Sequence, residues 1–130
     1  MESGKNHRRE LGRLGENLAC DYLRRHGHTI LERNWRSGHL EIDIISHDAD
    51  GIHFVEVKAR KESIQAPPQD NVGHLKQKRI VKAALSYLNN MHDKIFGSSE
   101  CFFDVMAVTF TDTEARLEWI PQAYIYLEQT

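Results

Sequence analysis

The chain has 130 residues, enough for one domain with a hydrophobic core but hardly for two. Hydrophobic residues make up 40% and charged residues 28%, as in ordinary soluble globular proteins, and no apolar run reaches the ~20 residues that cross a bilayer. The N-terminal residues also lack the apolar centre of a signal peptide. We therefore expect one cytoplasmic domain over residues 1–130, with loose ends at residues 1–7 and at the extreme C-terminus.

The charge of the chain is distributed unevenly. The formal net charge is only −2, but residues 1–82 carry a balance of +3 and residues 83–130 a balance of −5. Clustered lysine and arginine are the footprint expected for phosphate contacts, although a solvated basic helix face would look the same. Cys20 and Cys101 lie far apart with no CxxC spacing, which predicts reduced thiols in or near the core.

The first predicted element is a helix from about Arg8 to His26, ended by Gly27. Its apolar stripe is formed by Leu11, Leu14, Leu18 and Tyr22. Gly12 and Gly15 each cost a helix about 1 kcal/mol relative to alanine, so they indicate that another backbone or a ligand passes close by. Glu16, at the edge of the stripe, can lean over the rim of whatever the helix covers.

A short strand is predicted at residues 28–33, followed by a connection over 34–38 and then by two strands within residues 39–60. The two strands are joined by a tight turn at residues 48–51. Alternation of side chains puts Leu40, Ile42 and Ile44 on one face of the first strand, with Glu41 and Asp43 on the other.

Antiparallel pairing about this turn sets Asp43 roughly opposite Glu56, with Cβ atoms ~5 Å apart. Like charges at that distance repel each other. A divalent cation between them, with Lys58 beside it, would relieve the repulsion. The alternative is a structural ion-pair cluster at the edge of a sheet.

The second half of the chain predicts one more helix and two more strands. Residues 61–73 form a loop containing Pro67-Pro68, and a helix runs from Val72 or His74 to Met91. Residues 92–100 form a turn, residues 101–110 a central strand covered on both faces, and residues 115–120 an edge strand ended by Pro121. The order α-β-β-β-α-β-β predicts an α/β fold in which helices pack on both faces of a mixed sheet of about five strands.

Asp43, a gap of twelve residues, and Glu56-Val57-Lys58 together resemble the PD-(D/E)xK signature of restriction-endonuclease-like nucleases. Over residues 10–125, the stretches GRLGENLACDYLRRHGHTILERNWR, EIDII, FVEVKAR, KQKRIVKAALSYL and FDVMAV are similar to the YraN-like family of uncharacterised bacterial proteins. The resemblance implies a restriction-endonuclease-like fold and metal-dependent hydrolysis of DNA, in branched or flapped substrates. Because small resolvases of that superfamily cut two strands symmetrically, it also suggests a homodimer.

The candidate catalytic residues are Glu16, Asp43, Glu56 and Lys58. Mg²⁺ or Mn²⁺ prefers oxygen ligands, which Asp43, Glu56 and the backbone carbonyl of Val57 can supply. Lys58 can orient the attacking water and stabilise the developing anion. Glu16 can hold a second metal or a metal-bound water, or it can simply pair with a neighbouring arginine of its helix.

Nucleic acid, in particular DNA, is the expected partner, and no membrane is. Phosphate contacts are predicted for Arg60, Lys61, Lys76 and Arg79. Arg36 can clamp an unpaired base that stacks on Trp35, unless that indole is a core anchor.

The eight histidines match no zinc-ligand spacing, so no zinc site is expected. A structural role is expected for Asp104, paired with Lys58 or an arginine or capping the end of the sheet. Two other functions remain open: a non-catalytic nucleic-acid-binding protein of the same fold, and a protein-interaction factor that uses the acidic C-terminal third. Metal-dependent DNA cleavage, lost in Asp43→Ala and Lys58→Ala, distinguishes the enzyme from both.

Overall fold

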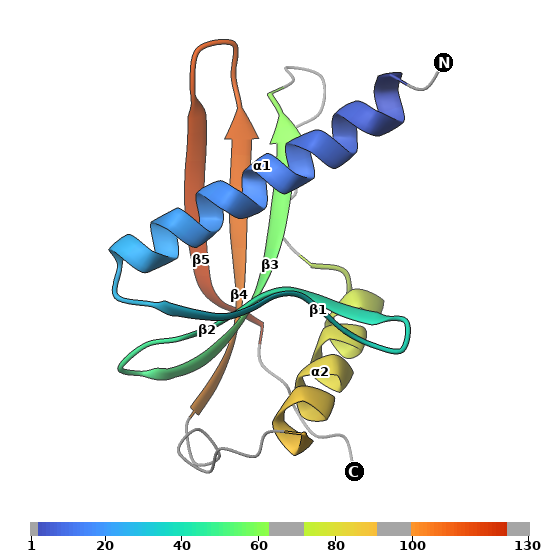
Figure 1. Cartoon of the computed structure of the whole chain (residues 1–130), viewed down its shortest axis with the longest axis vertical. Coiled ribbons are helices and arrows are strands. Elements are labelled where there is room, and N and C mark those ends of the chain that lie inside the picture. Colours follow the sequence, from blue (N-terminus) through green and yellow to red (C-terminus); the bar gives the residue numbers. More distant parts are fainter. Residues whose placement is uncertain (1–2, 63–71, 91–99, 125–130) are drawn as a thin grey trace.

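A computed structural model describes residues 3–62, 72–90 and 100–124 (Figure 1). The elements of these segments follow the predicted order: α1 Ser3–Arg25, β1 Thr29–Ser37, β2 Leu40–His47, β3 Gly51–Lys61, α2 His74–Asn89, β4 Glu100–Phe110 and β5 Ala115–Tyr124. The strands form one sheet in the order β1-β2-β3-β4-β5, in which β3 and β4 are parallel and the other neighbours antiparallel. The prediction of an α/β fold with a mixed five-stranded sheet is confirmed.

Several boundaries differ from the predicted ones. Helix α1 begins at Ser3 and therefore includes part of the segment that was expected to be loose. Strand β1 continues to Ser37, which pairs with Leu40, so the predicted connection over residues 34–38 is wrong. Tertiary pairing with β2 extends this strand through residues whose own sequence suggested a loop. The predicted loop at Pro67-Pro68 and the turn at Gly97 lie outside the described residues.

Strand β5 also runs further than expected, through Pro121 to Tyr124. Proline is tolerated there because β5 is an edge strand, where one row of backbone groups needs no partner strand. Just beyond the proline, Gln122 adopts a positive φ of 49°, and the register with β4 shifts between Phe103 and Val105. The strand thus passes the proline by an irregularity in the pairing instead of ending.

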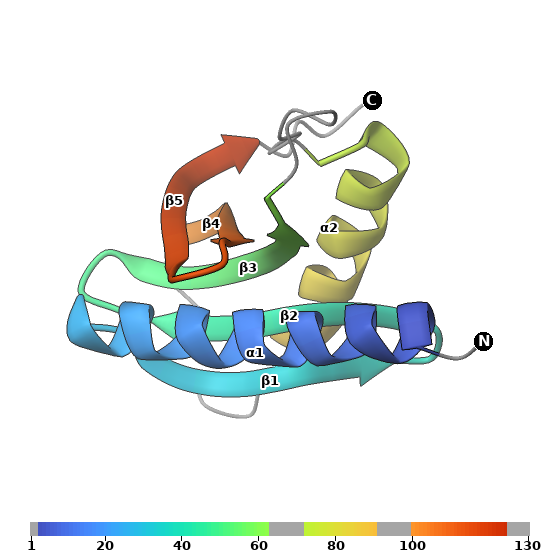
Figure 2. The same ribbon diagram turned by 90° about the horizontal axis from the view of Figure 1, so that it is seen from above.

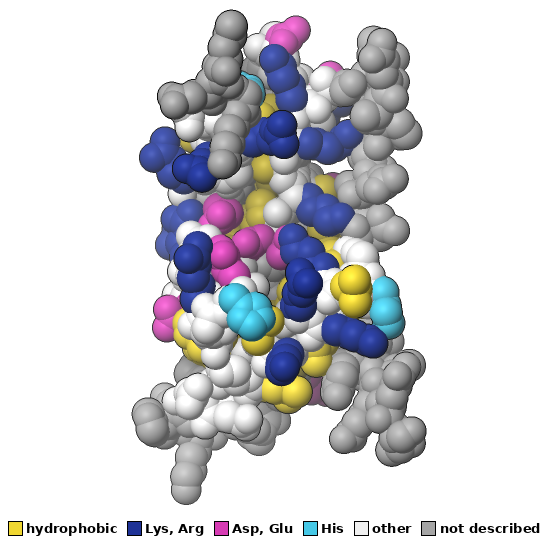
Figure 3. Space-filling model, turned by 90° about the vertical axis from the view of Figure 1, so that its right-hand side faces the viewer, with side chains coloured by type: hydrophobic (Ala, Val, Ile, Leu, Met, Phe, Trp, Pro, Cys, Tyr) yellow, Lys and Arg dark blue, Asp and Glu magenta, His cyan; other side chains and the backbone are white. Residues whose placement is uncertain are grey.

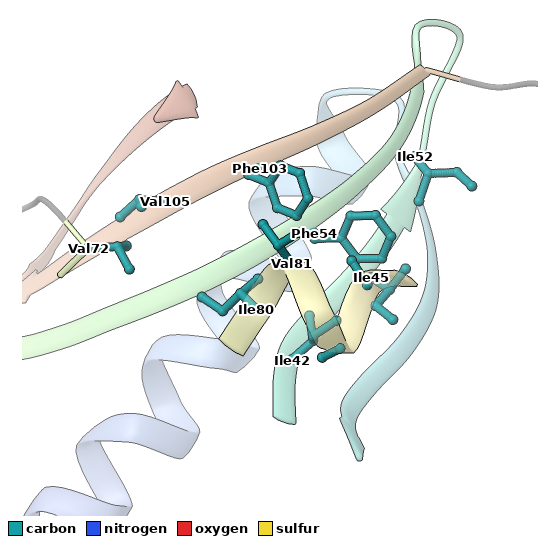
Figure 4. Close-up of a cluster of buried hydrophobic side chains, with 11 residues drawn as sticks. Ile42, Ile45, Ile52, Phe54, Val72, Ile80, Val81, Phe103 and Val105 are labelled. Atoms are coloured by element: carbon teal, nitrogen blue, oxygen red, sulfur yellow. The ribbon is translucent and has the colours of Figure 1, made fainter. Parts of the chain in front are cut away.

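The two helices cover opposite faces of the sheet (Figures 1 and 2). Helix α1 buries Ala19, Cys20 and Leu23 in one cluster with strand residues Ile44, Val55, Met106 and Val108. Helix α2 buries Ile80, Val81, Ala83 and Ala84 in a second cluster with Ile45, Phe54, Phe103 and Val105 (Figure 4). Full burial of one large apolar side chain contributes about 1.5–3 kcal/mol, so these clusters fix both helices to the sheet. Neither helix of the described chain has the length and apolar character needed to cross a membrane.

The buried face of α1 is rotated from the predicted stripe, since Leu14 is 40% exposed whereas Ala19 and Leu23 are fully buried. The reason is close approach to β3: a Cβ built on Gly15 would lie 2.7 Å from the Cβ of Ala59. The expectation of a close neighbour is therefore confirmed for Gly15. It is wrong for Gly12, where such a Cβ meets nothing within 4 Å.

Strands β2 and β3 separate in the middle of the sheet. The last pair between them is Ile44 with Val55, while β2 continues to pair with β1 as far as Leu40 (Figure 1). Ile42 packs in the cluster under α2 and Ile44 in the cluster under α1, so the predicted common face for these two residues is wrong. Beyond its last pair with β3, β2 turns away together with β1. Its successive side chains then no longer alternate strictly between the α1 face and the α2 face of the sheet. The separation opens a fork directly beyond residues 44 and 55.

Candidate functional site

A cleft of about 370 Å³ lies at this fork, between β2, β3 and the first half of α2. Figure 3 shows a face of the molecule on which acidic side chains gather at the centre, with lysine and arginine side chains around them. Three acidic and two basic residues, with three neighbours, line the cleft: Glu41, Asp43, Glu56, Lys76, Arg79, His39, Leu40 and Ile80. The cleft therefore combines a carboxylate centre with a cationic rim.

Asp43 and Glu56 lie at the apex of the fork, one residue beyond the last backbone pair. The Val57 amide, freed from a β2 partner, donates a hydrogen bond of 2.9 Å to Oδ2 of Asp43. The two carboxyl groups are within hydrogen-bonding reach of each other. Burial, and then the charge of Glu56, raise the pKa of Asp43 to about 8. In the absence of a metal ion, a proton held by Asp43 thus relieves the repulsion that the sequence predicted.

Lys76 supplies a second counter-charge to the pair. Its Nζ forms an ion pair with Oε1 of Glu56, whose side chain is only 7% exposed. Burial acts to lower the pKa of Lys76, but the hydrogen bond and the charge of Glu56 outweigh it, so that the pKa is raised. Lys76 was predicted to contact phosphate. In the structure its ammonium group points instead at the carboxylate centre.

Glu16 reaches the neighbourhood of the fork from α1. Its Oε1 is buried and has no hydrogen-bond partner among the described residues, while the side chain of Asn34 in β1 donates a hydrogen bond to the carboxylate. Burial raises the pKa of Glu16 and outweighs the charge of Arg33 and the hydrogen bond from Asn34, which act to lower it. A buried carboxylate oxygen without a donor is costly, which indicates that this side chain is shaped to receive a cation or a polar ligand.

The remaining predicted residues are distributed around this centre. Lys58 is half-buried on β3, two residues beyond Glu56, and alternation directs both side chains to the same face. Arg79 lines the cleft, whereas Arg60 and Lys61 follow along β3 and are not among its lining residues.

Two predicted nucleic-acid contacts have partners within the protein. Nη2 of Arg36 lies 3.3 Å from Oε2 of Glu41, in an ion pair with exposed side chains. Trp35 packs edge-on against Tyr87 of α2, with ring centroids 5.2 Å apart. The indole therefore acts as an anchor of the core, which was the alternative left open for it.

Sequence reasoning missed a second polar cluster, at the other end of the β2–β3 hairpin. It contains His28, Asp48, His53 and Asp104. Asp104 has the expected structural role, but with other partners than Lys58 or an arginine: it accepts hydrogen bonds from His53, from the Trp119 indole and from the Gln122 amide. The hairpin register, which places His53 opposite Ser46 and close to the turn, was the signal that could have revealed part of this cluster.

Comparison with known proteins gives one consistent family. The model of the uncharacterised protein family UPF0102 matches residues 15–108. A UPF0102 protein of Geobacter metallireducens is 42% identical over 118 residues, covering 91% of this chain and 94% of its own. One from Syntrophus aciditrophicus is 44% identical over 113 residues, with 87% of both chains covered, and one from Chlorobium chlorochromatii is 46% identical over 101 residues, with 76% and 74% covered. These matches confirm the resemblance to the YraN-like family, and the chain belongs to the uncharacterised protein family UPF0102.

Proposed function

We propose that this protein is a Mg²⁺- or Mn²⁺-dependent nuclease that hydrolyses DNA phosphodiester bonds in the cytoplasm, with branched or flapped DNA as its substrate. The observation that carries the proposal is the close pair of carboxyl groups of Asp43 and Glu56 at the fork of β2 and β3, within a cleft that two basic side chains of α2 also line.

The donor set at the fork suits a hard divalent cation. Mg²⁺ and Mn²⁺ are commonly held by one or two carboxylates with waters filling the other positions. Asp43 and Glu56 supply two carboxylates, and the Val57 carbonyl is close by in sequence. The buried Glu16 Oε1, which lacks a donor among the described residues, offers a further oxygen. A divalent ion would take over the role that the Asp43 proton and Lys76 have in its absence, which is to offset the mutual repulsion of these carboxylates.

A bound ion of this kind would stabilise charge on the phosphate and bring a water closer to hydroxide. The chain's own groups supply the remaining functions. Lys58 orients the attacking water and stabilises the developing anion. Arg79 holds the phosphate backbone at the mouth of the cleft. Lys76 joins it once a bound ion replaces the ammonium group beside Glu56, and both side chains then offset the repulsion between phosphate and carboxylates.

Cleavage of labelled single-stranded, duplex, flapped and four-way DNA in the presence of Mg²⁺ or Mn²⁺ tests the proposal. We expect cleavage by the wild-type protein, its loss on chelation, and a loss of a hundredfold or more in Asp43→Asn and in Lys58→Met. Glu118→Gln, which removes one exposed charge from β5, is the matched control and should cleave like wild type. Cleavage that persists in Asp43→Asn would point to a contaminating nuclease and refute the assignment.

The ion pair of Lys76 with Glu56 favours a second candidate, a DNA-binding protein without catalysis. In such a protein Lys76 stays paired with Glu56, so no metal ion binds there, and the basic side chains around the cleft only bind DNA. Such a protein binds the same DNA substrates with a steep dependence on salt but never cuts them.

Light scattering with and without four-way DNA tests whether the active form is the homodimer that symmetric cutting requires.

A further inference from the structure

The cluster of His28, Asp48, His53 and Asp104 joins segments that are far apart in the sequence. His28 follows the end of α1, Asp48 opens the turn between β2 and β3, His53 lies on β3 and Asp104 on β4. The side chains of His28 and Asp104 are fully buried, that of His53 is 6% exposed and that of Asp48 is 16% exposed. The cluster is therefore an interior polar site with one edge at the surface.

Three ligand atoms converge within this cluster. One ring nitrogen of His28, one ring nitrogen of His53 and one carboxylate oxygen of Asp48 all lie within 4.8 Å of one another. Nε2 of His28 is 3.4 Å from Oδ2 of Asp48, and Nε2 of His53 is 2.8 Å from Oδ1. Around a tetrahedral Zn²⁺ with bonds of about 2.0–2.1 Å, ligand atoms lie about 3.3 Å apart. The His28 distance is close to this value. The His53 distance is shorter and ends at the other oxygen of the same carboxylate, so the carboxylate must turn to offer one oxygen to an ion.

The far side of each ligand is held by another group. Nδ1 of His28 lies 2.9 Å from the buried Ser46 hydroxyl, and Nδ1 of His53 donates a 2.6 Å hydrogen bond to Asp104. Oδ1 of Asp48 accepts hydrogen bonds from the amides of Asp50 and Gly51, which leaves Oδ2 facing His28. Metal-binding histidines characteristically donate their other ring nitrogen to a carboxylate or similar group, which fixes the tautomer and turns the free nitrogen toward the ion.

The second ring nitrogen of His28 is an independent observation that points to a ligand. Its Nε2 is buried and forms no hydrogen bond with the described residues, although Asp48 is close. When Nδ1–H donates to Ser46, the lone pair of Nε2 points at a carboxylate oxygen, and a cation between these two atoms makes the contact favourable. In the other tautomer Nε2–H faces that oxygen at 3.4 Å, which is longer than an ordinary N–H···O hydrogen bond.

The charges that face the cluster also favour a dication. The ring of His53 lies between two carboxylates, 2.8 Å from Asp48 and 2.6 Å from Asp104. A divalent ion bound beside these two carboxylates balances their charge, which removes the cost of an uncompensated charge in the interior.

We propose that His28, Asp48 and His53 form a binding site for Zn²⁺, with Asp104 and Ser46 as its orienting partners and the fourth position open to water. The donor set of two imidazoles and one carboxylate is one that zinc commonly uses. The ion ties the hairpin turn to the end of α1 and, through Asp104, to β4. The site lies at the opposite end of the hairpin from Asp43 and Glu56, so it is separate from the proposed nuclease centre. The sequence-based expectation of no zinc is revised accordingly.

Metal titration of the intact chain, purified without a histidine tag and stripped with a chelator, tests this proposal. We expect one equivalent of Co²⁺ to give the strong visible absorption of four-coordinate cobalt, and Zn²⁺ to displace it. Calorimetry of the stripped protein should show a stoichiometry of about one Zn²⁺ per chain. Saturating Zn²⁺ should also raise the melting temperature of the wild-type protein by several degrees.

His28→Gln and Asp48→Asn should each weaken Zn²⁺ binding tenfold or more, with circular dichroism confirming that they fold. His26→Gln, which changes an exposed histidine two residues from His28, is the matched control and should bind like wild type. Asp43→Asn should also bind Zn²⁺ like wild type, because it alters only the other centre. A cobalt spectrum of six-coordinate type in the wild-type protein overturns the proposal without reference to any variant. So does Zn²⁺ binding that survives both ligand substitutions or disappears in Asp43→Asn.

Discussion

Replacing Asp43 with asparagine should stabilise the metal-free protein above neutral pH. Asparagine keeps the shape of the side chain, can still accept the hydrogen bond from the Val57 amide, and can donate to the carboxylate of Glu56. It removes the one feature that makes the pair costly, a second ionisable carboxyl group at the fork.

The magnitude follows from proton linkage. The pKa of Asp43 is about 8 in the folded protein against an ordinary value of 3.8, because of burial and then the charge of Glu56. Between these values the folded state holds a proton that the unfolded state has released, so wild-type stability falls as pH rises toward 8 and levels off above it. Each pH unit within this window costs about 1.4 kcal/mol. The advantage of Asp43→Asn over wild type should thus grow by about 4 kcal/mol between pH 5 and pH 8.5.

Urea unfolding followed by tryptophan fluorescence, in buffer containing a chelator, measures this difference at the two pH values. Using the difference between variant and wild type cancels groups that titrate alike in both. Glu118→Gln removes an exposed carboxylate and should show no such growth. If the advantage of Asp43→Asn changes by less than about 1 kcal/mol between pH 5 and pH 8.5, the carboxyl pair does not share a proton and the reasoning is wrong.

The same experiment with Mn²⁺ relates the pair to the proposed metal site. Because a carboxylate ligand must be deprotonated, metal binding competes with the Asp43 proton and should strengthen as pH rises toward 8. Mn²⁺ should therefore stabilise wild type more at pH 8.5 than at pH 6 and have little effect on Asp43→Asn. Equal stabilisation of both proteins would place the ion elsewhere.

Two further changes test the packing around the cleft. In buffer containing a chelator, Lys76→Ala should lower the free energy of unfolding by about 1–2 kcal/mol, because Glu56 loses its counter-charge. The loss stays below the roughly 3–5 kcal/mol of a fully buried ion pair, because the lysine side chain is 56% exposed. Added Mn²⁺ should recover part of this loss, and no recovery would argue against a cation at Glu56. Gly15→Ala should cost about 1–3 kcal/mol because its Cβ would lie 2.7 Å from that of Ala59. Gly12→Ala, in open space on the same helix, should stabilise the protein by about 0.5–1 kcal/mol, and equal signs for the two variants in urea unfolding would contradict the helix placement.

The sequence by itself determined the features that depend on local periodicity and turn chemistry. The turn at residues 48–51 sets the register of the hairpin, which is enough to bring Asp43 opposite Glu56, and the structure has these two carboxyl groups in contact. Gly27, predicted to end α1, has the positive φ of 88° that such a terminus requires. The register of a hairpin and the end of a helix each depend on only a few neighbouring residues, so they can be predicted from the sequence of this one chain.

The tertiary structure alone decided where the partners of these residues come from. The fork exists because β2 separates from β3 and continues beside β1, where Ile42 packs in the cluster under α2. The hydrophobic periodicity of the sequence does not predict this separation. Lys76 reaches Glu56 from α2, twenty residues further along the chain, and no spacing rule of the sequence relates these two positions. Asp104 comes to His53 only because β4 lies parallel to β3 after the α2 crossover. Contacts of this kind depend on how whole elements are placed against one another, and the residues at the two ends of each contact carry no local sign of it.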